Sequence, residues 1–132
     1  MALTLDQANE SMPFAKDIGV VFTQVDPDIV KAHLDWTPEL CTVGETMHGG
    51  ALMTLADAAG AMAAFVNLPE GAFGTTTVTS AANFVRAVRD GRANAVSKVL
   101  HKGRSTIVVE TSITNGEGRT VAKVTQTQAV LS

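Results

Sequence analysis

The pattern of apolar and polar positions divides the chain into one long apolar segment and several shorter alternating ones. The long segment covers about residues 49–66 and is rich in Ala, Leu and Met. It is too long for a typical strand and therefore predicts a helix. Because apolar residues occur nearly all round this helix, it has no face suited to water, and we expect other parts of the protein to surround it.

The remaining alternating segments predict strands. Two precede the long helix and are separated by the turn sequence "DPD"; four follow a loop with the sequence "NLPEGAFG". The predicted strands are residues 18–25, 29–36, 75–85, 93–101, 105–114 and 119–131, and "NGEG" forms a hairpin before the last. Consecutive strands with short turns exclude a series of βαβ units. We therefore expect an α+β fold in which a mostly antiparallel sheet curls around one long central helix.

The N-terminal residues 4–12 predict a short helix that ends before Pro13. Thr4 is a suitable N-cap, and Gln7 stands three residues later, as in a capping box. No linker, repeat or low-complexity segment interrupts the chain, so residues 1–132 are expected to form a single domain.

Composition narrows the classes of protein. The chain is 45% hydrophobic with a net charge of −3, which favours a globular protein and argues against a general nucleic-acid surface. Asp57 and glycines interrupt the apolar segment, which argues against a membrane span. The single Cys41 cannot form an internal disulfide, zinc-type Cys/His spacing is absent, and the first residues do not resemble a signal peptide. We expect a cytoplasmic protein without a metal or other cofactor.

Six of the ten Lys and Arg residues fall between positions 86 and 104, where Asp90 is the only acid. They are Arg86, Arg89, Arg92, Lys98, Lys102 and Arg104. This basic block suits a phosphorylated ligand. The alternative is a solvated face of strands and turns.

Asp57 is the one acid inside the apolar segment. Burial of an ionised carboxylate costs several kcal/mol unless it is paired or hydrogen-bonded. One explanation is structural, with hydroxyls of the "TTTVTS" strand satisfying the carboxylate. The other is chemical, with Asp57 acting as a general base or nucleophile in apolar surroundings.

His48, Gly49 and Gly50 open the predicted helix. Backbone N–H groups in a first helical turn lack intrahelical partners, and glycines leave them accessible, so a ligand oxygen can bind there as in an oxyanion hole. The alternative is a tight turn into the helix. Gly49 and Asp57 are separated by roughly 12 Å along a helix, so one reacting carbonyl reaches both only if they come from different subunits.

Four stretches together resemble the hotdog-fold acyl-CoA thioesterases of the phenylacetate-pathway (PaaI-type) branch. They are "GETMHGGALMTLADAAGAMAAF", "TTTVTSAANFVRAVRDG", "HKGRSTIVVETSI" and "GRTVAKVTQT". The resemblance covers roughly residues 15–130 and implies a sheet wrapped around a central helix, dimers with joined sheets that often pair into tetramers, and hydrolysis of a fatty or aromatic acyl-CoA. No membrane or nucleic-acid partner is implied, and coenzyme A enters as part of the substrate.

The resemblance also implies residue roles. Gly49 matches the backbone donor to the thioester carbonyl, and Asp57 matches the base or nucleophile. Thr77 matches a Ser or Thr that positions the attacking water, while His48 matches the motif histidine that orders the helix entrance. The expected substrate contacts are Gly50, Arg86, Arg89, Lys102, Gly103, Arg104 and Ser105.

Two positions before the helix are less clear. Related enzymes commonly carry Asn or Gln where this chain has Thr42, whose hydroxyl is shorter. Glu45 is either a second acid near the entrance or a surface loop residue. The acyl pocket is expected to draw its walls from Met53, Met62, Phe65 and Phe84.

Two other functions fit the same residues. A hotdog dehydratase acting on a hydroxyacyl thioester would use His48 beside Asp57, although here the histidine precedes two glycines. A protein that binds and senses acyl-CoA without turning it over is also compatible with the fold. The choice between an aryl and a medium-chain acyl group remains open at this level.

Overall fold

The structure is a computed structural model, and it describes residues 2–132. Within these residues, six strands form one antiparallel sheet in the order β1-β2-β4-β5-β6-β3. The strands are β1 (Val21–Val25), β2 (Val30–Asp35), β3 (Gly74–Phe84), β4 (Arg92–Lys102), β5 (Thr106–Thr114) and β6 (Thr120–Leu131). The six predicted strands and the mostly antiparallel sheet are confirmed.

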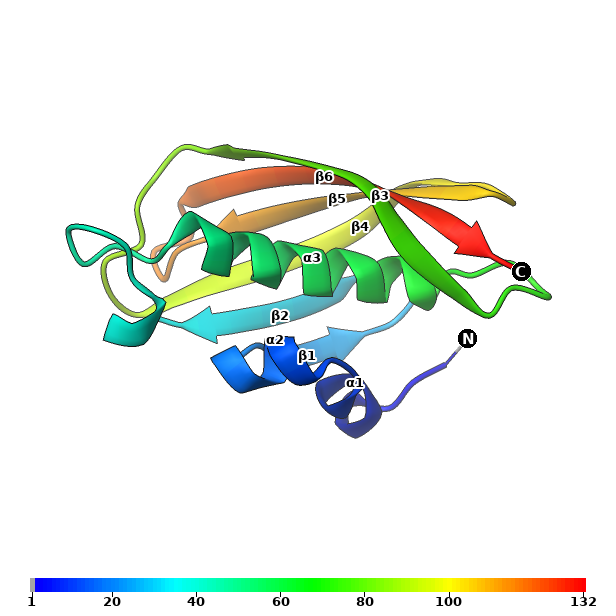
Figure 1. Ribbon diagram of the computed structural model, residues 1–132, viewed down its shortest axis with the longest axis horizontal. Coiled ribbons are helices and arrows are strands. Elements are labelled where there is room, and N and C mark those ends of the chain that lie inside the picture. The colour runs from blue at the N-terminus through cyan, green and yellow to red at the C-terminus, as the bar shows by residue number, and fades with distance from the viewer. Residues whose placement is uncertain (1) are drawn as a thin grey trace.

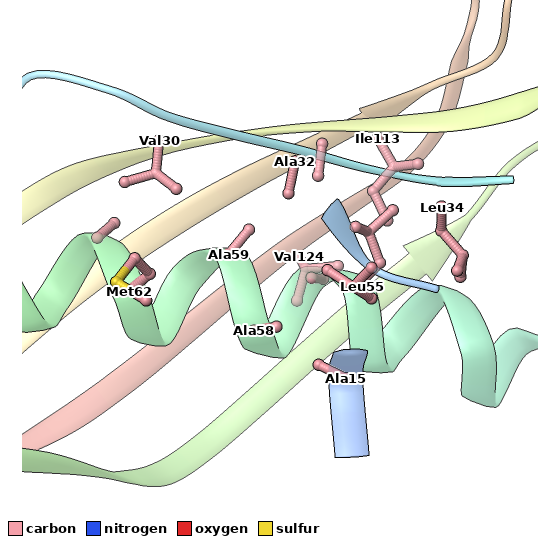
Figure 2. Close-up of a cluster of buried hydrophobic side chains, with 14 of the residues drawn as sticks. Ala15, Val30, Ala32, Leu34, Leu55, Ala58, Ala59, Met62, Ile113 and Val124 are labelled. Atoms are coloured by element: carbon pink, nitrogen blue, oxygen red, sulfur yellow. The ribbon is translucent and has the colours of Figure 1, made fainter. Parts of the chain in front are cut away.

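The central helix α3 (Gly49–Phe65) is wrapped by this sheet, as predicted. It contacts every strand, and Figure 1 shows β1 and β2 on one side of it and β3 on the other. Leu55 and Ala59 are fully buried, and Figure 2 shows them facing apolar side chains of the strands, including Val30 and Ala32. On β5 the alternating face that begins at Ile107 is buried along its length. The core is therefore the layer between α3 and the concave face of the sheet.

Small side chains on α3 allow close approach of the strands. The clearest case is Gly60, where an added Cβ would overlap with Oε1 of Gln126 on β6. The Gln126 amide therefore lies directly against the helix backbone. A side chain at position 60 would have to displace this amide, so the glycine here serves the close approach of β6 to α3 and not an unusual backbone conformation.

One face of α3 and the neighbouring edge of the sheet remain uncovered. Asp57 is exposed, and so are residues 76–81 of β3, with Val78 at 61% of its full accessibility. We call Asp57 and residues 76–81 the open edge. The sheet curls over the other sides of α3 but stops at β3, so the protomer alone does not surround the helix completely.

Strand β3 contains an irregularity in the middle of the open edge. Thr77 pairs with Gln128 and Thr79 with Thr127, so Val78 is an extra residue in β3. Such a bulge changes which face the following side chains occupy. Because of it, Thr77 before the bulge and Phe84 after it both face α3, although they are seven positions apart.

The N-terminal region differs partly from the prediction. Helix α1 (Leu5–Ser11) has the expected capping box between Thr4 and Gln7 and ends before Pro13. The predicted strand 18–25 starts too early, because a second helix, α2 (Pro13–Ile18), precedes β1. Pro13 is the first residue of α2. At this position the backbone N–H would have no partner within the helix, so the missing N–H of proline costs no hydrogen bond and Pro13 can begin a new helix directly after α1.

A short 3₁₀ helix, η1 (Pro38–Leu40), follows β2, and the connection to α3 then forms a bridge between Cys41 and Met47. Among residues 2–132, every helix is too short or too polar to cross a membrane.

Candidate active site

The entrance of α3 is organised by His48. Its Nδ1 accepts a hydrogen bond from the backbone N–H of Gly50 at 2.7 Å, so His48 is the N-cap of the helix. This geometry fits the expected role of the histidine in ordering the entrance. It also uses the N–H of Gly50, which we had expected to be open to a ligand oxygen.

Gly49 differs from Gly50. No hydrogen bond among residues 2–132 uses its N–H, and Gly49 lines a surface hollow of about 390 Å³ together with Phe84 and Arg86. The free donor at the positive end of the helix is therefore the N–H of Gly49, and it opens onto a surface that a ligand can reach.

Asp57 lies in the middle of α3 and is linked to β3 and β6 by a chain of hydrogen bonds. The hydroxyl of Thr77 donates to Oδ1 of Asp57 at 3.3 Å, and Nε2 of Gln128 donates to Oγ1 of Thr77 at 2.7 Å. The structure thus brings Asp57 and Thr77 together, as the sequence suggested for this pair.

The expectation of a buried Asp57 is wrong for the single protomer, because its side chain is on the open edge and exposed. The sheet ends at β3 and leaves this side of α3 uncovered. No ion pair among residues 2–132 involves Asp57, so a carboxylate oxygen remains accessible to a reacting group.

Gly49 and Asp57 do not form one site within a protomer. They are at the start and the middle of the same straight helix, roughly 12 Å apart at about 1.5 Å per residue. Two copies of the chain are needed if both groups act on one carbonyl.

Thr42 and Glu45 lie in the exposed connection before α3. Thr42 contributes its backbone N–H to the carbonyl of Thr46, while Glu45 has a positive φ of 60° and accepts a hydrogen bond at its carbonyl from the indole of Trp36. Among the described residues, neither side chain makes a hydrogen bond. The geometry of Glu45 fits a loop residue with a structural role.

Cys41 is next to these residues, but it does not suit nucleophilic chemistry. Loss of solvent, together with the Glu45 and Glu39 carboxylates, raises the pKa of the Cys41 thiol. The thiol is therefore protonated at neutral pH and is a poor nucleophile.

The basic block is divided between the two ends of β4. Arg86 and Arg89 lie in the connection between β3 and β4, whereas residues 102–105 form the hairpin that follows β4. The eleven residues of β4 separate the two groups by roughly 35 Å. One protomer therefore does not bring Arg86 and Arg89 together with Lys102, Gly103, Arg104 and Ser105.

Some basic residues also have partners within the protomer. Arg86 donates to the carbonyl of Thr120 at 2.6 Å, and Arg92 forms an ion pair with Asp35 at 2.7 Å. The guanidinium of Arg92 lowers the pKa of Asp35 through this hydrogen bond. Arg92 is thus committed to β2, while Arg86 remains beside Gly49.

A cavity of about 360 Å³ is lined by α3 and β3, starting one helical turn beyond Asp57. Ala61, one turn beyond Asp57, and Thr75, two residues before Thr77, are part of its lining. Of the four predicted pocket walls, Met62 and Phe65 line this cavity, Phe84 lines the hollow at Gly49, and Met53 lines neither of the two. Leu3 and Met12 also belong to its apolar wall, and neither was predicted from the sequence.

Gln128 is the residue of this site that the sequence analysis missed. It is 1% exposed and belongs to the inward face of β6, where it follows Gln126 by two positions. The available signal was the alternation in "VTQTQAV", which puts two amides at positions where a core strand normally has apolar residues.

Comparison with known proteins supports the resemblance seen in the sequence. A model of the thioesterase superfamily matches residues 44–122. The proofreading thioesterase EntH of Cronobacter sakazakii is 29% identical over 119 residues, which are 89% of this chain and 86% of EntH.

Solved structures give the same result. A variant of thioesterase PA1618 from Pseudomonas aeruginosa superposes with a TM-score of 0.92 at 26% identity, covering 99% of this chain and 96% of the other. The PaaI protein of the E. coli phenylacetic acid degradation operon has a TM-score of 0.85 at 22% identity, covering 98% and 97%, and shares the fold. Because the matched region contains the entrance, α3 and β3, this chain belongs to the thioesterase superfamily and is a thioester hydrolase with the hotdog fold.

Proposed function

We propose that the protein hydrolyses an acyl-CoA to the free acid and coenzyme A, at a site shared by two subunits. The observation that carries this proposal is a pair of groups on α3: the N–H of Gly49 at its start, which makes no hydrogen bond among residues 2–132, and the exposed carboxylate of Asp57 at its middle. These are the donor and the acceptor that thioester hydrolysis needs.

In the proposed reaction, the Gly49 N–H of one subunit polarises the thioester carbonyl. Asp57 of the other subunit then acts in one of two ways. It takes a proton from a water molecule whose oxygen attacks the carbonyl carbon, or the Asp57 carboxylate attacks that carbon directly. The negative charge that develops on the carbonyl oxygen is stabilised at the helix N-terminus. The C–S bond then breaks, and the thiolate of coenzyme A leaves. Where Asp57 attacks directly, the acyl group is left on its carboxylate as a mixed anhydride, and water hydrolyses this anhydride to give the free acid and restore Asp57. No metal is required for these steps.

A homodimer joined along the open edge fits this chemistry. An exposed edge strand offers unpaired backbone groups to a second copy, and antiparallel pairing of two β3 strands would cover Val78 and Asp57 together. Because the two sheets would then run in opposite directions, the end of one sheet that carries the hairpin at 102–105 would lie beside the end of the other that carries Arg86 and Arg89. The divided basic block then has one ligand in the phosphates of coenzyme A. Pairing of such dimers into a tetramer is part of the same proposal.

The acyl group would occupy the 360 Å³ cavity that starts one helical turn beyond Asp57. This volume lies in the usual range for small-ligand pockets, and the lining is largely apolar, with Met62, Phe65 and Met12 among its walls. A phenylacetyl-like or a medium-chain acyl group suits such a cavity.

The central test measures thiol release from phenylacetyl-CoA and from a series of straight-chain acyl-CoA substrates. We expect Asp57→Asn to lower kcat by about 100-fold or more, since it removes the base while keeping the size of the side chain. Asp90→Asn, in the loop before β4, is the control and should retain activity. Full activity of Asp57→Asn would remove Asp57 from the mechanism.

The role of the Gly49 N–H can be tested without removing a side chain. Gly49→Pro deletes this N–H at the first position of a helix, where proline is tolerated, and His48 already has the extended backbone (φ −61°, ψ 137°) that a following proline requires. We expect a loss of about 100-fold in kcat. Gly49→Ala keeps the N–H, and its Cβ would make only an ordinary contact of 3.8 Å with Phe84, so it is the matched control.

Mixing the two inactive variants tests whether the site is shared. A dimer with one Asp57→Asn and one Gly49→Pro subunit has one fully intact site, so random exchange at equal amounts should restore about one quarter of wild-type activity. Absence of any restoration despite proven subunit exchange would contradict a shared site. Retained acyl-CoA binding without thiol release by the wild-type protein would favour the sensor, and hydration of an enoyl thioester would favour the dehydratase.

A further inference from the structure

Strand β6 presents two buried glutamines to α3, and only one of them is hydrogen-bonded. Gln126 and Gln128 are two positions apart on the same face and are 0% and 1% exposed. Gln128 donates to Thr77, whereas neither amide atom of Gln126 has a partner among residues 2–132. The two glutamines are equally buried, so their difference in hydrogen bonding indicates a polar role for Gln128 and a packing role for Gln126.

The bond from Gln128 determines the direction of the next bond. Its Nε2 can only donate, so Oγ1 of Thr77 is an acceptor in this contact, at 2.7 Å. The single hydroxyl proton of Thr77 must then point elsewhere. This proton is donated to Oδ1 of Asp57, which lies 3.3 Å from Oγ1 of Thr77.

A carboxylate held in this way keeps one oxygen occupied and the other free. Thr77 fixes Oδ1, so Oδ2 of Asp57 is left to meet the water or the thioester carbon. Thr77 is exposed on the open edge and could otherwise rotate its hydroxyl toward solvent, but Gln128 is buried and cannot exchange its partner for water. Of the three hydrogen-bonded residues, the most rigidly held is therefore Gln128, which is also the farthest from the reacting atoms.

We propose that Gln128 is a positioning residue for catalysis: it holds the Thr77 hydroxyl as a donor to Asp57 and thereby orients the free carboxylate oxygen. This inference rests on the proposed role of Asp57. Gln128 does not touch the substrate, so its loss affects the reaction through Thr77 alone.

The experiment compares steady-state thiol release by Gln128→Met, Thr77→Val, the double variant and Gln126→Met. Methionine preserves an unbranched apolar stem of similar length and removes the amide. We expect Gln128→Met to lower kcat by about tenfold with KM changed less than about twofold, because the loss concerns the reacting groups and not substrate binding. Gln126→Met, matched in residue type, strand and burial, should keep kcat within about twofold of wild type.

The double variant tests the pathway of the effect. If Gln128 acts only through Thr77, Thr77→Val with Gln128→Met should be no slower than Thr77→Val alone. Gln128→Glu provides a second substitution of the same shape: its carboxylate accepts the Thr77 proton and draws it away from Asp57, so its kcat should fall at least as far as that of Gln128→Met.

Three results would overturn the proposal: wild-type kcat in Gln128→Met, multiplicative losses in the double variant, or an equal loss in Gln126→Met. Asp57→Asn is measured in the same series. If Asp57→Asn is inactive while Gln128→Met is unaffected, only the positioning role fails. If Asp57→Asn is fully active, the proposed function fails as well.

Discussion

Replacement of Gln126 by methionine is expected to stabilise the fold. The side chain is fully buried, and both Oε1 and Nε2 lack partners among residues 2–132. A buried polar group without a partner costs about 1–3 kcal/mol, since it has lost its bonds to water and gained none. The amide lies against Gly60, where the helix backbone already satisfies its own hydrogen bonds. Position 126 therefore stores a local cost that the rest of the core offsets.

Methionine keeps the length of the side chain and replaces the amide with apolar atoms. Removal of the unpaired groups should raise the free energy of unfolding by about 2 kcal/mol. For a chain of 132 residues this corresponds to an increase of roughly 6–10 °C in Tm. Gln128→Met is the contrasting variant, because it breaks an existing bond and should lower the free energy of unfolding by about 1 kcal/mol.

The assay is urea unfolding followed by the fluorescence of Trp36, the only tryptophan. Protein concentration must be the same for all variants, because assembly contributes to apparent stability. An unchanged slope m would show that the variants differ in stability and not in the extent of unfolding. Equal or lower stability of Gln126→Met would refute the reasoning, since it would mean that the amide has a favourable partner in solution.

Three other predictions concern the open edge, the cavity and a titrating residue. Val78→Lys puts a charge in the middle of β3 and should give monomers in analytical ultracentrifugation with at least a tenfold loss of thiol release, whereas Glu117→Lys in the β5–β6 hairpin should change neither. Ala61→Phe fills the cavity one helical turn beyond Asp57 and should lower kcat/KM by about tenfold for octanoyl-CoA but not for acetyl-CoA; an equal loss for both would argue against this acyl site. Burial, assisted by the charge of Arg92 and opposed by Asp35, lowers the pKa of His33 from its ordinary 6.5, so the unfolded chain binds the proton more strongly. The free energy of unfolding should therefore fall as the pH drops below about 6.5, and less steeply in His33→Gln, as measured by urea unfolding across this range.

The periodic elements could be predicted from the sequence because their patterns are local. The alternation in β5 and the apolar run of α3 give both the type of element and its buried face. Helix α2 and the start of β1 could not be predicted, because Pro13 marks the end of the first helix in the sequence and is also the first residue of α2, which moves the start of β1 to Val21.

The candidate site divides in the same way. His48, Gly49 and Asp57 belong to one segment with recognisable spacing, and Thr77 follows from the resemblance. The partner Gln128 is 51 positions beyond Thr77, and their contact depends on the pairing of β3 with β6. The exposure of Asp57 likewise depends on where the sheet ends, which no local pattern determines.

The extra residue at Val78 has a consequence for how this chain can vary. Deletion of Val78 would remove the bulge and leave Thr77 and Phe84 six positions apart, an even spacing that keeps both side chains on the face toward α3 in a regular strand. One residue gained or lost elsewhere between them, with the bulge kept, would instead turn either Thr77 away from Asp57 or Phe84 away from the helix entrance. A change of one residue is therefore expected to be tolerated at position 78 itself and not at its neighbours in β3.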